Sequence, residues 1–300
     1  MQFQQTLKDK YTFEGKGLHT GKVAVMTVMP APVNTGIVFR RTDLGDGAIV
    51  EALAENVSNT ARSTTIAKGE ASVSTIEHIM SALTGLGIDN AFIDIDNVEV
   101  PILDGSAKPY IDVMWKDGAE IQSEPRKYIE VKETIELTND NGSLVRIEPA
   151  EEFSYDIEVD FNSRVLGVQN ASWNGAVEYA TEIGVCRTFV FFHELQFLFA
   201  NNLVKGGDVD NAIVIVEYPV TDEQVQQMSE LFNVPALTVR EDGYLSNLVL
   251  RFPNECSRHK LLDLIGDLRL SGGFLKAKVT AVKAGHGINT ETARKIRENI

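Results

Sequence analysis

The sequence predicts a protein of the α+β class, and three observations support that prediction. Segments of alternating apolar and polar residues, typical of half-buried strands, are interleaved with segments of helical periodicity. A polar stretch at 116–127, with Gly118 and Pro125, interrupts them and is the best linker in the chain. A histidine-bearing helix that ends in glycines and leads into a strand is predicted on each side of that linker.

Composition limits the classes of function. The 300 residues are enough for two domains of ordinary size or one large one, and a hydrophobic content of 43% supports a sizeable core. The formal net charge of -15 argues against a nucleic-acid partner, because such proteins usually carry a basic stripe. Solubility alone is the simpler explanation of that acidity.

The chain carries no pattern of export or membrane insertion. Its opening, "MQFQQTLKDKYTF", lacks the apolar core and cleavage site of a signal peptide. No apolar run approaches the ~20 residues that a membrane helix needs. Cys186 and Cys256 have no metal-type spacing, which suits buried thiols in a reducing compartment. We therefore expect a cytoplasmic protein that does not span a membrane.

The first half is predicted to contain strands and two helices. Alternation at 22–31 and 90–100 predicts strands. Helical periodicity at 74–87 predicts a helix with Ser74 as its N-cap and a glycine at its end. A short helix is expected at 107–116, after a turn-rich segment.

The second half is predicted to follow a similar pattern. Strands are predicted in "YIEVKETIEL", "SLVRIEP" and "FSYDIEVDF", and again at 211–220 and 274–285. Helices are expected at 188–203, where the sequence turns strongly apolar, and at 258–267. The chain closes with a helix that is predicted to be capped near Asn289.

The two halves echo each other. The text "EHIMSALTGLGIDNAFIDID" in the first half has the same order of features as "RHKLLDLIGDLRLSGGFLKAKVTAV" in the second. Chance is one explanation, since helix–glycine–strand segments are common, and an internal duplication is the other. If two such halves face each other, both histidine-bearing helices line one interface, where binding sites are often found.

The helix at 258–267 has a polar side that needs an explanation. His259, Asp263, Gly266 and Asp267 share one arc of the helix, and leucine and isoleucine occupy the opposite arc. Taken alone, these residues favour an ordinary amphipathic helix with its polar side in water. The other interpretation is that this side faces a cleft, where His259 and Asp263, one turn apart, converge on a metal ion.

Three residues match the needs of a catalytic zinc ion, which takes three protein ligands and keeps one position open. His78, His259 and Asp263 would supply two imidazoles and one carboxylate, and Glu77 beside His78 can take a proton from a metal-bound water. Glu77 also completes an S-x-x-E pattern with Ser74, so a capping box is an equal alternative.

Other polar residues have simpler expected roles. His286 in "AGHGIN" follows a strand and is predicted to project from a loop. His193 in "FFHEL" is expected to be structural, and the glycines around His19 predict a tight turn. Thr188 in "CRTF" suits a helix N-cap, while Asp267 can orient a histidine near a metal ion.

Several segments in a fixed order resemble one known family. They are "GKGLHTG", "STIEHIMSAL", "GIDNAFIDID", "PILDGSAKPY", "CRTF", "GGDVDNAIV", "RHKLLDLIGDL" and "GHGIN". Together they resemble the UDP-3-O-acyl-N-acetylglucosamine deacetylases, the zinc amidases of lipid A biosynthesis, from about residue 3 to the last helix. The resemblance implies two domains of similar topology, 1–124 and 125–300, each a β-sheet layered with helices. The helix layers would meet at the active site, with the helix at 258–267 facing the cleft.

The resemblance also implies roles for individual residues. The expected metal ligands are His78, His259 and Asp263. The expected catalytic residues are Glu77 as general base, His286 as oxyanion partner or proton donor, Asp267 holding His286, and Thr188 donating a hydrogen bond to the oxyanion.

Substrate contacts are implied in the same way. Lys260 and Phe161 would contact the nucleotide, and Phe189 with an apolar insert at about 189–220 would form the acyl-chain passage. His19 and Ser63 would lie in the substrate-binding region, and some members of the family have a cysteine where Ser63 stands.

The implied reaction is hydrolysis of the N-acetyl group of UDP-3-O-(3-hydroxyacyl)-N-acetylglucosamine, giving acetate and the free amine, in Gram-negative bacteria. One Zn²⁺ is the expected cofactor, with iron as the alternative metal, and the acylated sugar nucleotide is the expected substrate. Some members are fused to an acyl-carrier-protein dehydratase, so such a fusion is a further expectation. The alternatives are a zinc amidase that acts on another acylated amine and a catalytically dead interaction protein.

Overall fold

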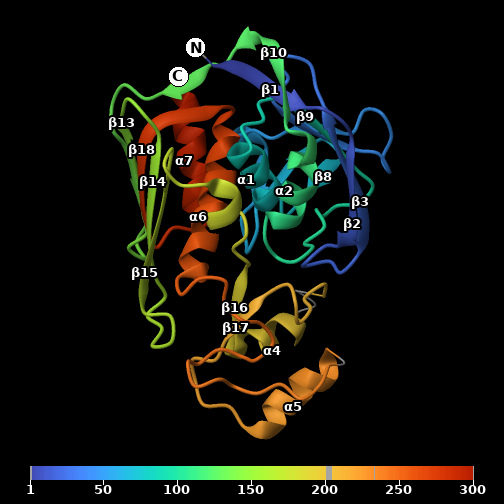
Figure 1. Ribbon diagram of the computed structural model, residues 1–300, viewed down its shortest axis with the longest axis vertical. Helices are drawn as coiled ribbons and strands as arrows, with labels where there is room; N and C mark the ends of the chain where they lie inside the picture. Colours follow the sequence, from blue (N-terminus) through green and yellow to red (C-terminus); the bar gives the residue numbers. More distant parts are fainter. Residues whose placement is uncertain (1, 201–204, 233, 300) are drawn as a thin grey trace.

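Two β-sheets enclose a layer of helices in this protein. The computed structural model describes residues 2–200, 205–232 and 234–299. Figure 1 shows one sheet on each outer side of the molecule, with α1, α6 and α7 between them and a smaller group of elements below. The predicted α+β class is therefore confirmed.

The N-terminal sheet has the strand order β2-β3-β9-β4-β5. Its strands are β2 (Tyr11–Lys16), β3 (Val23–Pro30), β4 (Ile37–Arg41), β5 (Ile49–Glu51) and β9 (Ala91–Ile95). The central strand β9 runs antiparallel to β3 and parallel to β4. Ala91, Ile93 and Ile95 alternate with half-buried residues and are fully buried, so one face of this sheet covers the helices.

The C-terminal sheet has the order β12-β13-β18-β14-β15, and β11 also pairs with β18. Its strands are β11 (Tyr128–Glu130), β12 (Ile135–Thr138), β13 (Leu144–Pro149), β14 (Ser154–Asp160), β15 (Val168–Asn174) and β18 (Phe274–Val282). The central strand β18 runs antiparallel to β13 and parallel to β14. Its buried positions, such as Ala277 and Val279, alternate as the sequence predicts.

The two sheets have the same topology. In each, a first hairpin is followed in space by a central strand that comes last in the sequence, and then by a second antiparallel pair. In each, a long helix immediately precedes that central strand: α1 (Glu77–Gly85) precedes β9, and α6 (Glu255–Leu268) precedes β18. The echo between the two histidine-bearing segments therefore corresponds to a repeated arrangement of elements.

The helix layer brings α1 and α6 into direct contact. Gly266 makes this possible, because a Cβ at that position would lie 2.1 Å from the carbonyl oxygen of Glu77. All residues of α6 except Arg258 and Lys260 are buried. The interpretation of this helix as one with a polar side in water is therefore wrong. The layer also contains α2 (Lys108–Met114) and α7 (His286–Glu298).

The segment predicted to be a linker is a strand. Residues Ala119–Pro125 form β10, which pairs antiparallel with β1 (Phe3–Leu7) at the top of Figure 1. Its polar composition matches its exposure, because the residues of β10 are exposed or half-buried on both of its faces. The division into domains 1–124 and 125–300 stays a prediction, and β10 spans its proposed boundary.

Short elements complete the two halves. They are the strands β6 (Val57–Asn59), β7 (Thr65–Lys68) and β8 (Ala71–Val73), the helix α3 (Tyr179–Glu182), and the 3-10 helices η1 (Ala54–Asn56), η2 (Trp115–Asp117) and η3 (Arg269–Ser271). No helix in the described residues is both long and apolar enough to cross a membrane.

The apolar insert forms a separate group of elements at the bottom of Figure 1. It contains β16 (Phe189–Phe191), α4 (Phe192–Ala200), β17 (Ile213–Ile215) and α5 (Asp222–Leu231). The helix expected over 188–203 is therefore partly wrong, because its first turn is a strand that pairs parallel with β17. Residues 201–203 of that expected helix, like residues 1, 204, 233 and 300, lie outside the described residues.

Candidate metal centre

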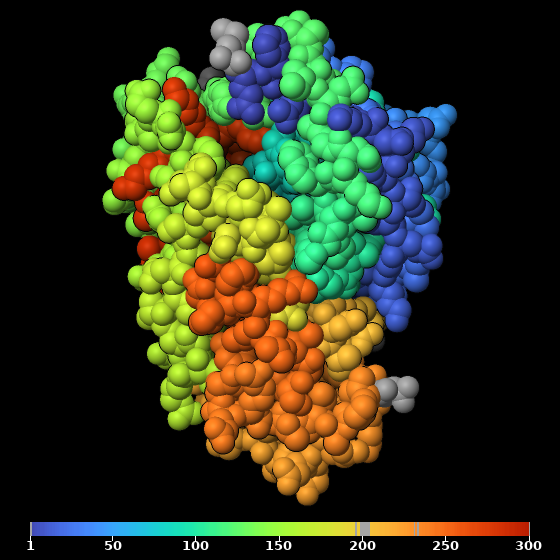
Figure 2. All heavy atoms as spheres, viewed as in Figure 1, coloured from blue at the N-terminus to red at the C-terminus, as the bar shows by residue number. Residues whose placement is uncertain are grey.

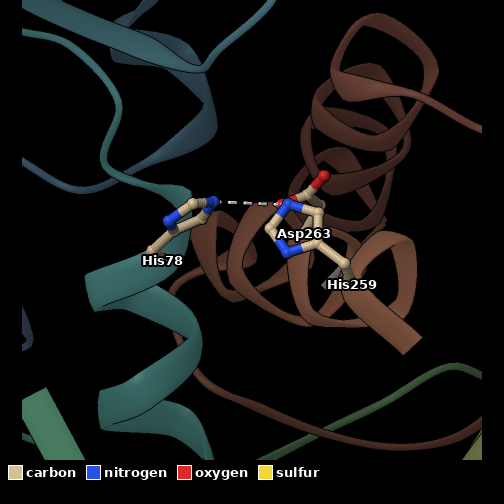
Figure 3. A group of neighbouring side chains, drawn as sticks. All are labelled: His78, His259 and Asp263. Atoms are coloured by element: carbon tan, nitrogen blue, oxygen red, sulfur yellow. Dashed lines mark ion pairs between the residues drawn. The ribbon is translucent and has the colours of Figure 1, made fainter. Parts of the chain in front are cut away.

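Two helices from different halves of the chain bring three possible metal ligands together. His78 lies on α1, and His259 and Asp263 lie one turn apart on α6 (Figure 3). One ligand atom from each residue lies within 4.8 Å of the others. The Nε2 atoms of His78 and His259 are 3.6 Å and 3.4 Å from Oδ1 of Asp263, and all three side chains are buried.

An unpartnered oxygen marks the centre of this cluster. Asp263 Oδ1 is buried and accepts no hydrogen bond from the described residues, although leaving a buried carboxylate oxygen unpaired is costly. Its other oxygen, Oδ2, accepts a hydrogen bond from Lys260 Nζ at 2.8 Å. Two imidazole nitrogens and one carboxylate oxygen that converge in this way fit a divalent ion of the zinc type.

The surroundings of the ligands hold them in metal-binding form. His259 Nδ1 lies 3.0 Å from the carbonyl oxygen of Cys186, so Nδ1 carries the proton and Nε2 is left free for a metal ion. Burial lowers the pKa of His259 to about 4, which keeps this imidazole neutral. Burial alone would raise the pKa of Asp263, but the Lys260 ammonium and His259 hold it well below its ordinary value.

Glu77 begins α1, beside His78, and the capping-box alternative for it is wrong. The N-cap is Ile76, with no side-chain cap, and the hydroxyl of Ser74 donates instead to the carbonyl of Val98. Glu77 Oε2 accepts the backbone N–H of Thr64 at 3.0 Å. Burial raises the pKa of Glu77 above its ordinary value, which makes it a stronger base than a carboxylate in water.

A strained residue directs the chain into α1. Thr75 has φ 58°, a left-handed conformation that is unusual for a β-branched residue. Its hydroxyl donates to Glu99 Oε1, and its side chain is buried at the edge of the centre. Strain of this kind often occurs at functional sites, and here it lies two positions before Glu77.

His286 stands on the first turn of α7, not in a loop. This helix begins at His286 with Gly285 as its N-cap, so the start predicted near Asn289 is too late. His286 Nδ1 is 2.9 Å from Asp267 Oδ2. Burial alone would lower the pKa of His286, but the Asp267 carboxylate raises it to about 9, so the imidazole is positively charged at neutral pH.

Asp267 is fully buried and has partners on both oxygens. Thr64 Oγ1 donates to Oδ1 at 2.6 Å, and Asn289 Nδ2 donates to Oδ2 at 3.0 Å beside His286. Asp267 therefore contacts His286 and lies outside the His78, His259 and Asp263 cluster.

A cavity of about 390 Å³ connects the cluster to the remaining expected residues. Thr188, Phe189, Phe161 and Lys260 line it together with the metal-ligand cluster, Glu77 and His286. The rings of Phe161 and Phe189 pack edge to face with centroids 5.5 Å apart. Thr188 precedes β16, so its interpretation as a helix N-cap is wrong.

Four of the residues considered in the sequence analysis do not line this cavity: Asp267, His19, Ser63 and His193. Leu18 lines it in place of its neighbour His19, whose backbone N–H donates to Glu99. Ser63 is buried between Arg62, which does line the cavity, and Thr64. His193 is exposed on α4 between the rings of Phe191 and Tyr218.

Several supporting residues gave no signal in the sequence. The Thr64 backbone and hydroxyl contact both Glu77 and Asp267, and the Cys186 carbonyl orients His259. Arg62, which has φ 66°, reaches the cavity and pairs with Glu194 of α4. The only hint was the short polar run "ARSTT", which has no recognised spacing.

A second, larger cavity of about 540 Å³ adjoins the first. Arg62, Phe161, Lys260 and His286 line both cavities, and the ion pair of Lys283 with Asp160 lines the second. On the other side, Val190 joins the first cavity to a small apolar one of about 20 Å³ within the insert.

The fold and the cluster define a protein of two repeated sheet-and-helix halves, with a candidate His-His-Asp metal centre between them. The chain belongs to the UDP-3-O-acyl N-acetylglycosamine deacetylase family, whose model matches residues 4–234 and 233–298.

Related proteins fall into two groups. The chain is 44% identical to the bifunctional enzyme LpxC/FabZ of Porphyromonas gingivalis and 41% identical to that of Bacteroides thetaiotaomicron, over 100% and 99% of its length. It spans 65% of the length of each of these relatives. It is 38% identical to the UDP-3-O-acyl-N-acetylglucosamine deacetylase of Teredinibacter turnerae, covering 98% of this chain and 89% of that protein.

Proposed function

We propose that this chain hydrolyses the N-acetyl group of a UDP-3-O-acyl-N-acetylglucosamine, using water and releasing acetate and the free sugar amine. In this proposal His78, His259 and Asp263 hold one Zn²⁺. The observation that carries the proposal is the buried Asp263 Oδ1, which has no partner among the described residues and lies within 3.6 Å of both imidazole Nε2 atoms. Family membership supports the choice of reaction and substrate.

The metal ion, when bound, would polarise the acetamide carbonyl and make a water more acidic. Glu77 removes the proton from that water as it attacks the carbonyl carbon. Burial supports this role, because it raises the pKa of Glu77 and so increases its basicity.

Two groups stabilise the negative charge that develops on the carbonyl oxygen. His286 carries a positive charge, since Asp267 raises its pKa to about 9. The hydroxyl of Thr188, which lines the same cavity, donates a hydrogen bond. His286 can also give its proton to the nitrogen of the leaving amine, which completes the proton balance of the hydrolysis.

The two adjoining cavities suit the two ends of the substrate. Lys260 and Arg62, with Lys283 paired to Asp160, place cationic groups in the larger cavity for the diphosphate, and the exposed ring of Phe161 offers an apolar surface beside them. The apolar residues of the insert suit the acyl chain. The space within the insert, about 20 Å³, is enough for about one water, so it has to widen when a chain enters.

The proposal also covers the cell compartment and fused domain. A cytoplasmic location stays a prediction, supported by the two free buried cysteines. A fused dehydratase domain stays a prediction as well, supported by the bifunctional relatives.

Zinc analysis of the purified protein, combined with an assay for acetate release from the acylated sugar nucleotide, tests the function. We expect about one zinc per chain and turnover that stops on chelation and returns with added zinc. Bound zinc without turnover of this substrate would favour an amidase for another acylated amine. A protein that binds no metal and releases no acetate would be the inactive interaction protein.

A further inference from the structure

A further cavity, separate from those at the metal centre, lies between the two halves at the opposite end of the helix layer. Its volume is about 220 Å³. The C-terminal ends of α1 and α6 contribute Gly85 and Ile265 to its lining, and β18 contributes Phe274. Glu77 and Gly85 are the two ends of α1, so the two sites are separated by about 12 Å along that helix.

This cavity is open to the surface. Figure 2 shows a hollow between the blue and green N-terminal segments on one side and the yellow-green β14–β15 hairpin on the other. Teal and red atoms lie at its floor, as expected for residues of α1 and of the segment that follows α6.

Aromatic rings form much of its wall. They belong to Tyr128, Phe153, Tyr155, Trp173 and Phe274. The Phe153 and Trp173 centroids are 4.8 Å apart, and those of Tyr155 and Trp173 are 5.5 Å apart, so these rings form one continuous surface. Such a surface favours a flat, apolar body.

Two buried arginines supply the polar end of the cavity. The guanidinium groups of Arg126 and Arg269 both stack on the ring of Phe274, with 4.0 Å and 4.1 Å from Cζ to the ring centroid. Arg126 Nε and Nη2 bind the Asp89 carboxylate, and Arg269 Nη2 donates to the backbone carbonyls of Ile88 and Asp89.

The remaining terminal nitrogen of each arginine, Nη1, makes no hydrogen bond of this kind. Arg269 Nη1 is buried and donates no hydrogen bond to any described residue, and Arg126 Nη1 makes none within the same part of the chain. The two cations share the single carboxylate of Asp89, so this end of the cavity carries an excess positive charge. A buried guanidinium with free N–H groups and an uncompensated charge calls for an anion, and carboxylates match its geometry.

The geometry points to a binding site for a small aromatic carboxylate, with its ring against Trp173 and Phe153 and its carboxylate at Nη1 of Arg126, beside the buried positive charge of Arg269. The cavity has the volume of several waters, at about 30 Å³ each, which limits the body to about one ring. This site is independent of the metal centre, because none of the metal ligands lines it.

Trp173 provides a local reporter for the test. The chain has two tryptophans, and the other, Trp115, is 47% exposed on η2, so Trp115→Phe leaves Trp173 as the only tryptophan, whose emission is excited selectively over that of the tyrosines. In that background we expect benzoate to change the emission saturably. Benzyl alcohol, which lacks the charge, and acetate, which lacks the ring, should bind at least tenfold more weakly.

Two variants distinguish the loss of benzoate binding at this site from a general effect of removing an arginine. Arg269→Gln should weaken benzoate binding at least tenfold, because it removes the charge but keeps an amide donor for the carbonyl groups. Arg40→Gln is the matched control, since Arg40 also stacks on a ring, that of Phe92, and pairs with a carboxylate, but lies outside this cavity. It should leave binding unchanged.

Three results would overturn the site: no saturable response to benzoate, an equal response to benzyl alcohol, or unchanged binding by Arg269→Gln. If Arg269→Gln does not fold, Phe153→Ala decides the question in equilibrium dialysis with radiolabelled benzoate. Phe153 is only partly buried, so its loss should be tolerated, and we expect at least a threefold loss of binding. Unchanged binding by this variant would equally end the proposal.

Discussion

Gly266 of α6 faces the carbonyl oxygen of Glu77 so closely that a Cβ on Gly266 would lie 2.1 Å from it. This contact fixes the spacing of the two helices that carry the possible metal ligands. Gly266→Ala should therefore force the helices apart and destabilise the protein by about 1–3 kcal/mol, as overpacking usually does. Thermal unfolding and zinc content are the measurements, and both should fall. Gly47→Ala, in open space on a loop, is the control and should change neither.

Glu77→Gln tests the general base. The amide keeps the size of the side chain but cannot take a proton, so kcat should fall by roughly 10²-fold or more while zinc content stays the same. Glu99→Gln is a buried control, because Glu99 binds backbone and hydroxyl groups near His19 and does not line the cavity. It should cost stability but keep most of kcat. Near-normal turnover by Glu77→Gln would remove Glu77 from the mechanism.

Two aspartates one turn apart on α6 allow a matched test of ligand and support. Asp263→Asn should reduce zinc stoichiometry strongly, because a neutral amide is a much weaker ligand than a carboxylate. Asp267→Asn should keep the zinc but lower kcat, since Asp267 contacts His286 and not the ligands. Metal analysis and kcat on the same preparations separate the two effects. Equal zinc loss in both variants would contradict these assignments.

The rate should have a bell-shaped dependence on pH. It should fall at low pH as Glu77 gains a proton, at a pH above the ordinary range for a carboxylate because burial raises the pKa of Glu77. It should fall at high pH as His286 loses its proton, near the pKa of about 9. Asp267→Asn removes the carboxylate that raises the His286 pKa, so the alkaline limb of kcat/KM should move to lower pH. An alkaline limb that does not move would assign it to another group.

Acyl-chain length should control substrate affinity. Each methylene buried in the insert contributes about 0.8 kcal/mol, so KM should rise roughly fourfold for each one removed. Inhibition by free UDP is the control, and it should not depend on the insert. A substrate without an acyl chain that binds as tightly as the full one would show that the insert has another purpose.

Sequence patterns predicted the parts of the fold that depend on local periodicity. Alternation in β3 and β18 reflects one buried face per strand, and the repeat around His78 and His259 anticipated the repeated topology. The pairing of 119–125 with β1 was missed, because edge strands with two exposed faces carry no alternating pattern.

The candidate site was predictable only in part, for a physical reason. His78, His259 and Asp263 are chemically distinctive, and they do lie together. Thr64 and Asp267 are 203 residues apart in the sequence, and a threonine hydroxyl has many possible partners, so nothing local indicates their hydrogen bond. The start of α7 was missed because Gly285 caps it with no side chain, which leaves no N-cap signal in the sequence.

The carbonyl of Cys186 that receives His259 Nδ1 lies three residues before β16, the first strand of the insert. The insert is thus connected to the rest of the chain through the short segment 186–189, and the Cys186 carbonyl in that segment also orients the His259 imidazole. If the insert widens for an acyl chain as proposed above, this short connection would pass part of that movement to the position of the His259 ring.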